Sequence, residues 1–128
     1  MERRVAQASV EKQQLEPGQI ARLAVEVAED KKATDIVLLD MRGVSAIADY
    51  FVICTASNAR QIRAVASAID EKLSEHGAPA FHREGAADTG WVLLDYSDVI
   101  VHIFGPTERD YYRLERLWSN AKTVIYLQ

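Results

Sequence analysis

Two carboxylates, Asp95 and Asp98, lie close together in the most acidic part of the chain. Enzymes that transfer nucleotides hold Mg²⁺ between carboxylates two residues apart on a strand, because this ion requires oxygen ligands in octahedral geometry. Asp95 and Asp98 are three residues apart and flank a predicted turn. Their spacing therefore favours turn residues or partner contacts over metal ligands.

The other reactive side chains do not form a recognisable catalytic or metal-binding set. Ser57, His102 and Asp98 could be assembled into a triad on paper, but any chain of this length allows such a combination. Cys54 is a lone cysteine in an apolar run, which predicts a buried, unreactive thiol. Metal-binding spacing is lacking among the three histidines, which are His76, His82 and His102. We expect no catalytic residue, metal or cofactor.

Aromatic residues accompany the acids in this segment. Trp91, Phe104, Tyr111 and Tyr112 are four of the ten aromatic residues in the chain. Aromatic side chains surrounded by acids suit the desolvated centre and polar rim of a protein interface. The same residues could equally form a second layer of core beneath a helix, and the pattern alone leaves both alternatives open.

The charge indicates what kind of partner would bind. The net charge is −4, and residues 86–110 hold five acids against one base. Nucleic-acid surfaces need clustered Lys and Arg, so we expect no direct DNA binding, whereas a basic protein would be complementary. No apolar run is long enough to span a membrane, and the first residues resemble neither a secretory signal nor a transit peptide. We therefore predict a cytoplasmic protein.

Apolar spacing predicts two helices, over residues 18–33 and 58–76. Asn58 is a suitable N-cap for the second helix, with Gln61 placed as in a capping box. Gly77 and Pro79 would end that helix. Apolar runs at residues 35–40 and 50–54 predict strands buried on both faces, and residues 80–84 could form a short strand.

Residues 91–95 and 98–104 predict a hairpin joined by Tyr96 and Ser97. Pairing Asp95 with Asp98 places aliphatic residues on one side, which should face the core, and aromatics, acids and His102 on the other. Thr107 would cap a helix to residue 119. The apolar stripe predicted for this helix, which omits Tyr112, is Tyr111, Leu114, Leu117 and Trp118.

These elements predict one α/β domain over residues 18–120, with a mixed β-sheet flanked by helices. Residues 1–17 are expected to be a flexible N-terminal tail, and residues 121–128 a C-terminal extension. The order of elements is similar to the nucleotidyltransferase fold, but the turn at residues 55–58 lacks the glycine that phosphate binding requires. A nucleotide-using enzyme of this fold is the alternative to a binding protein.

Several segments resemble the ribosomal silencing factor family, also known as the iojap-related family. The most specific are residues 98–102 (DVIVH) and the helix at residues 109–118 (RDYYRLERLW). Matching segments also occur at residues 35–40, 48–55, 57–61, 84–85 and 91–95. The resemblance covers residues 18–120 in the right order and spacing.

The resemblance implies a nucleotidyltransferase-like fold without catalytic residues, in a protein that is not an enzyme. It implies binding to the large-subunit ribosomal protein uL14 on the 50S subunit. Binding would sterically block association of the ribosomal subunits and repress translation during nutrient limitation. It further implies that the protein can form a homodimer. The partner contacts carried over from the motifs are Trp91, Tyr96, Phe104 and Tyr112, with Asp95, Asp98, His102 and Arg109 as less direct neighbours.

Overall fold

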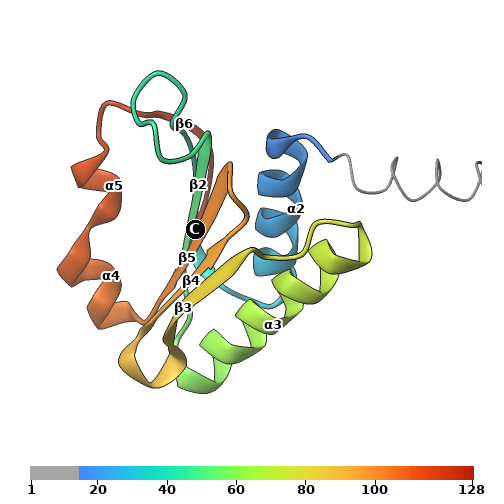
Figure 1. Cartoon of the computed structure of the whole chain (residues 1–128). Coiled ribbons are helices and arrows are strands. Elements are labelled where there is room, and N and C mark those ends of the chain that lie inside the picture. Colours follow the sequence, from blue (N-terminus) through green and yellow to red (C-terminus); the bar gives the residue numbers. More distant parts are fainter. Residues whose placement is uncertain (1–14) are drawn as a thin grey trace, which may run out of the picture.

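A six-stranded mixed sheet forms the centre of the computed structural model, which describes residues 15–128 (Figure 1). The strand order is β3-β4-β5-β2-β1-β6, and only β2 and β5 run parallel to each other. The strands are β1 Thr34–Asp40, β2 Tyr50–Thr55, β3 His82–Ala86, β4 Trp91–Asp95, β5 Val99–Phe104 and β6 Lys122–Leu127. This architecture confirms the predicted α/β class with a mixed sheet.

Helices cover the two faces of the sheet unequally. The long helices α2 (Pro17–Asp30) and α3 (Ala59–Glu75) pack on one face, while the short helices α4 (Pro106–Tyr112) and α5 (Leu114–Leu117) lie over the other (Figure 1). A single 3₁₀ turn, η1 (Ala87–Thr89), precedes β4. No helix in residues 15–128 is long and apolar enough to cross a membrane.

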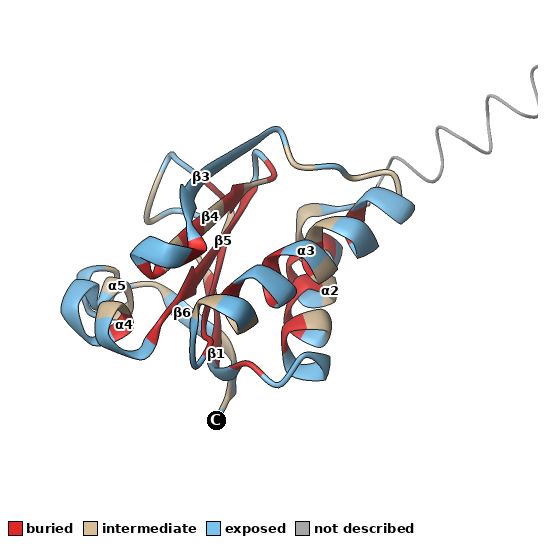
Figure 2. Ribbon diagram, turned by 90° about the horizontal axis from the view of Figure 1, so that it is seen from below, coloured by how far each residue is buried: buried red, intermediate tan, exposed pale blue. Residues whose placement is uncertain are grey.

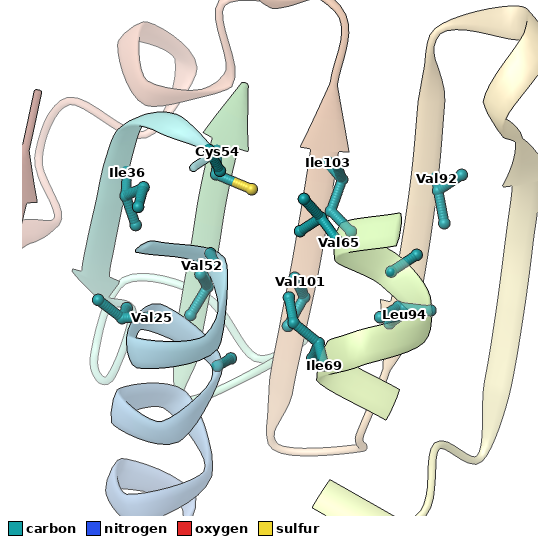
Figure 3. Close-up of a cluster of buried hydrophobic side chains, with 14 of the residues drawn as sticks. Val25, Ile36, Val52, Cys54, Val65, Ile69, Val92, Leu94, Val101 and Ile103 are labelled. Atoms are coloured by element: carbon teal, nitrogen blue, oxygen red, sulfur yellow. The ribbon is translucent and has the colours of Figure 1, made fainter. Parts of the chain in front are cut away.

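The face under α2 and α3 is an aliphatic core. Ile69 and Val65 of α3 meet Val101 and Ile103 of β5, and all four are fully buried (Figure 3). Burial is concentrated on the strands and on the sides of α2 and α3 that face them (Figure 2). Cys54 lies in this core, where burial raises the pKa of its thiol to about 12, so the thiol is inert as predicted.

Two side chains organise the first turn of α3, and one of them ties it to the rest of the fold. Asn58 caps the helix as predicted, because its side-chain oxygen accepts the backbone N–H of Gln61 at 2.9 Å. The expected capping box does not form, since the Gln61 side chain accepts from Ser57 instead. The same amide donates to the carbonyl oxygens of Lys31 and Lys32, which fixes α3 beside the turn that follows α2.

The β4–β5 hairpin differs from the predicted register by two residues. Trp91 pairs with Phe104 and Asp95 with Ile100, so the turn consists of Ser97 and Asp98. Ser97 has a φ of 73°, and Asp95 Oδ1 accepts its backbone N–H at 2.7 Å. Because a shift of two residues preserves the alternation of side chains, the aliphatic side still faces the core as predicted.

Three other predictions about the C-terminal half need correction. Residues 121–128 are not an extension outside the domain, since β6 pairs with β1 in the sheet. The last helix begins at Pro106 with Gly105 as N-cap, not at Thr107, and it breaks at Arg113, whose φ is 49°. The short strand predicted at residues 80–84 forms two residues later, as β3.

The predicted N-terminal tail falls mainly on residues 1–14, which lie outside the described residues. Its last residues belong to α2, because Glu16 is the N-cap and Pro17 the first helical residue.

Candidate protein-binding surface

The second face of the sheet carries a layer of aromatic side chains beneath α4 and α5. Phe104 and His102 of β5 are buried there, with Phe51 of β2 beside them and Trp118 above. Ring centroids of Phe51 and Trp118 are 6.1 Å apart, in an edge-on arrangement that aromatic pairs favour. This part of the predicted mixed face is therefore core.

His102 is buried within this layer and is uncharged. Its Nδ1 accepts the indole N–H of Trp91 at 3.3 Å, and its ring stacks on that of Phe104. Within residues 15–128 the other ring nitrogen, Nε2, has no hydrogen-bond partner. Burial lowers the pKa of His102 to about 4, because an imidazolium would lose its hydration without gaining a counter-charge.

Arg109 fixes α4 to the sheet. Its guanidinium donates to Thr55 of β2 at 2.9 Å and to the carboxylate of Glu115 in α5 at 2.9 Å. The residue is only 9 % exposed, so the charge is removed from water and needs both partners. This buried contact positions the segment that carries the outer aromatic residues.

The aromatic layer continues outward to a surface formed by Trp91, Leu93, Tyr111 and Tyr112, which we call the aromatic surface. Ring centroids of Trp91 and Tyr112 are 4.6 Å apart, and those of Tyr111 and Tyr112 are 5.0 Å apart. Tyr112 is 43 % exposed and Tyr111 is 77 % exposed. The face therefore combines a buried interior with an exposed edge. The sequence left open whether these aromatic residues form a second layer of core or an exposed surface, and the structure contains both.

The break at Arg113 explains why the predicted apolar stripe is only partly correct. A left-handed residue interrupts the helical repeat, so α5 continues in a different phase from α4. Leu114 and Trp118 pack on the aromatic layer as predicted, whereas Tyr111 and Leu117 point into solvent. Tyr112, which lies off the predicted stripe, packs on Trp91 instead.

One acidic side chain lies directly beside the aromatic surface. Glu84 of β3 pairs across the sheet with Leu93 and is exposed. Two further acids on neighbouring elements are paired with arginines, since Asp88 of η1 contacts Arg63 of α3 and Asp110 of α4 contacts Arg113. Within residues 15–128 the aromatic surface therefore has a single carboxylate, that of Glu84, at its edge.

The predicted contact residues do not all lie at this surface. The structure brings Trp91, His102, Phe104 and Tyr112 together, with Arg109 buried behind α4. His102 and Phe104 are buried, so they support the surface from below rather than contact a partner. Asp95 and Asp98 lie at the other end of the hairpin, with Asp98 exposed in its turn.

Tyr96 lies on the opposite side of the sheet and is 4 % exposed. Its hydroxyl donates to Asp70 of α3 at 3.2 Å, and burial raises the pKa of this phenol. The structure therefore places Tyr96 away from the aromatic surface, and its assignment as a partner contact stays a prediction from the motif. Leu93 and Glu84 lie at the aromatic surface but were not among the predicted contact residues. Alternation along β4 places Leu93 on the same side as Trp91 and Asp95 and could have indicated it.

Residues 13–128 match the family model described as ribosomal silencing factor during starvation. The chain belongs to the ribosomal silencing factor family. It is 43 % identical over 102 residues to the ribosomal silencing factor RsfS of Bacillus subtilis, with 80 % of this chain and 86 % of the relative covered. A relative from maize, the chloroplastic protein Iojap, is 38 % identical over 100 residues, which cover 76 % of this chain and 42 % of that protein.

Solved structures share the fold of this ribosomal silencing factor. A crystal structure of a protein from Chromobacterium violaceum has a TM-score of 0.78 at 37 % identity, covering 82 % of this chain and 88 % of that one. A second, from Bacillus halodurans, has a TM-score of 0.73 at 39 % identity, with 84 % and 98 % covered. Silencing of ribosomes, a regulatory role, is therefore the activity of the family to which the chain belongs.

Groups typical of catalysis are not assembled in the described part of this ribosomal silencing factor. Within residues 15–128, no group of three or more His, Cys, Asp or Glu side chains is placed to hold a metal ion. Asp95 stabilises the hairpin turn through Ser97, which is one of the two roles that its spacing predicted. Ser57, at the turn after β2, bonds to Gln61, and His102 lies on the aromatic face with its Nδ1 occupied by Trp91.

Proposed function

We propose that this ribosomal silencing factor binds the large-subunit ribosomal protein uL14 through the aromatic surface. Bound there on the 50S subunit, it would sterically block association of the ribosomal subunits and repress translation during nutrient limitation. The family supports a ribosomal partner, and the bacterial relatives support a ribosome of the cytoplasm.

The observation that carries the proposal is the open aromatic edge above a buried aromatic layer. Trp91 and Tyr112 are held in place by Phe104 and His102 beneath them, so little side-chain entropy is lost on binding. Large aromatic residues at the centre of an interface are frequent hot spots. The carboxylate of Glu84 at the edge of this surface and the net charge of −4 complement a basic ribosomal protein and would speed association.

Subunit joining tests the function directly. Purified 30S and 50S subunits are mixed at joining concentrations of Mg²⁺, with and without saturating protein, and separated on sucrose gradients. We expect the 70S peak to fall and the protein to sediment with 50S subunits. An undiminished 70S peak at saturating protein would contradict the proposal.

Tyr112→Ala tests the surface. Because Tyr112 packs against Trp91 at the exposed edge, its removal should weaken uL14 binding by roughly 2 kcal/mol or more, as for interface hot spots. Calorimetry with purified uL14 measures the affinity. Tyr126→Ala is the matched control, since Tyr126 is 54 % exposed on β6, at the opposite edge of the sheet.

The alternative, a nucleotide-using enzyme of nucleotidyltransferase-like fold, has less support. The turn that joins β2 to α3 holds no glycine, and the Ser57 hydroxyl is engaged with Gln61. We therefore propose a nucleotidyltransferase-like fold that acts without catalysis. Calorimetry with ATP and Mg²⁺ discriminates between a binding protein and a nucleotide-using enzyme. Mg²⁺-dependent binding of ATP at micromolar concentration would support the enzyme.

A homodimer is also part of the proposal. If two copies associate through the aromatic surface, dimerisation competes with the ribosome for the same residues. Light scattering on the wild-type protein and on Trp91→Asp measures this. A monomeric variant that also loses uL14 binding supports a shared surface, whereas a dimer that persists in the variant would place self-association elsewhere.

A further inference from the structure

A hollow of about 200 Å³ opens beside the aromatic surface, between β3, β4 and α4. Its lining is mostly apolar and includes one carboxylate. The residues that line it are Glu84, Gly85, Thr89, Trp91, Leu93 and Tyr112. A space of this size, open at the centre of the proposed interface, can accept one side chain of a partner.

Gly85 lets the backbone of β3 approach that of β4 closely at one side of this hollow. Its φ is 82°, a conformation that L-residues rarely adopt, and a Cβ at this position would collide with the carbonyl oxygen of Trp91. A larger residue at this position would therefore displace β4, which carries Trp91 and Leu93 of the lining.

The walls suit a side chain that is apolar along its stem and cationic at its end. Trp91 and Tyr112 present aromatic rings, and Leu93 presents an aliphatic surface, on which methylene groups can pack. Glu84 lies across from Leu93 in the β3–β4 register, on the same side of the sheet. An ammonium or guanidinium group would therefore meet a carboxylate at the rim and an aromatic ring beside it.

Glu84 is free to change partners. Its carboxylate is bonded to His82 Nε2 at 2.8 Å, but both side chains are more than half exposed. A contact between exposed groups contributes little stability. An incoming cation can replace His82 without breaking a buried interaction.

We infer that this hollow receives one arginine or lysine side chain of the basic ribosomal protein, with its stem on Trp91 and Leu93 and its charge on Glu84. The inference rests on the proposed function and adds the chemistry of the anchoring contact. The occupant is a cation because Glu84 is the one charged side chain that residues 15–128 contribute to the lining, and it is a carboxylate.

The first test compares variants in uL14 binding measured by calorimetry. Glu84→Gln removes the charge while keeping the shape, and we expect it to weaken binding about tenfold, as for loss of a charge-assisted hydrogen bond. Glu75→Gln, an exposed acid at the end of α3, is the matched control and should bind as the wild type does. Leu93→Phe, which enlarges a wall residue, should also weaken binding.

The outcomes separate this inference from the proposed function. If Tyr112→Ala loses affinity while Glu84→Gln binds like the wild type, the surface is correct and the cationic anchor is wrong. If Leu93→Phe alone weakens binding, the hollow takes an uncharged aliphatic side chain, which also overturns the inference. If Tyr112→Ala has no effect, the proposed function itself fails.

A second test needs no ribosomal protein. Acetyl-arginine amide is titrated into the isotopically labelled protein, and the indole N–H signal of Trp91 is followed by NMR. We expect the signal to shift with acetyl-arginine amide in the wild type, and to shift less in Glu84→Gln. An equal shift with acetyl-norleucine amide, which lacks the charge, would overturn the cationic specificity.

Discussion

The two faces of the sheet differ in their side chains and in the helices that cover them. Under α2 and α3 the side chains are aliphatic and almost all fully buried, and both helices are long enough to cover the strands (Figure 2). Under α4 and α5 the aromatic rings of Phe51, Phe104, Trp91 and Trp118 lie among aliphatic side chains, and the covering helices are short and broken at Arg113.

We expect this difference to separate the residues that stabilise the fold from the residues that bind a partner. Aliphatic side chains that interlock on the α2–α3 face have no polar atoms to satisfy and stabilise the fold by burial alone. Aromatic side chains on the α4–α5 face extend from the core to the solvent, so the layer that fills the interior also has an exposed edge. Mutations on the two faces should therefore affect different measurements.

The largest expected effect is on the aliphatic face. Ile69→Ala should lower the free energy of unfolding by roughly 2 to 5 kcal/mol, because it leaves a cavity between α3 and the sheet at a fully buried position. Denaturant titration measures this change. The affinity for uL14 of the fraction that remains folded should be unchanged, and a specific loss of affinity would break the division between the faces.

On the aromatic face, burial of His102 should make the free energy of unfolding depend on pH. Burial lowers the pKa of His102 from 6.5 to about 4, so below pH 6.5 the unfolded chain binds a proton that the folded protein does not. Stability contributed by the neutral imidazole is complete above pH 6.5 and should decrease by about 3 kcal/mol as the pH falls to 4.

His102→Phe supplies the control for this pH dependence. The phenyl ring keeps the aromatic contacts with Phe51 and Phe104 but cannot titrate. The difference between the stability–pH curves of the two proteins, from denaturant titrations, isolates the imidazole. Parallel curves between pH 4 and 6.5 would show that His102 is not shielded from water.

The smallest effect is expected at the outer side of α5. Leu117 is 68 % exposed, so Leu117→Ser should change the free energy of unfolding by less than about 0.5 kcal/mol. Leu114→Ser, at a half-buried position against the aromatic layer, should cost more. Equal losses in thermal unfolding of the two variants would mean that both leucines are part of the core.

Much of the fold follows from local patterns in the sequence. The apolar stripe of α3 and the cap at Asn58 are set by neighbours within one or two helical turns, so they could be predicted. The two faces of the hairpin were also predicted correctly despite the wrong register, because alternation survives a shift of two residues.

The remaining features depend on distant contacts or on unusual backbone conformations. No sequence signal marks a left-handed Arg113, because such a conformation is typical of glycine or asparagine. The burial of Tyr96 was missed because motif matching took precedence over alternation, which places Tyr96 on the same side as Leu94. The open edge at Trp91 and Tyr112 depends on where the short helices stop.

The position of β6 has a consequence for how the protein is made. β1 and β6 are neighbours in the sheet, with Asp40 paired to Lys122, although almost the whole domain separates them in the chain. During synthesis β1 is made long before residues 122–127, so one edge of β1 has no partner until β6 has left the exit tunnel. Until then the folding protein carries an unprotected strand edge, which is a site for unwanted pairing with other chains.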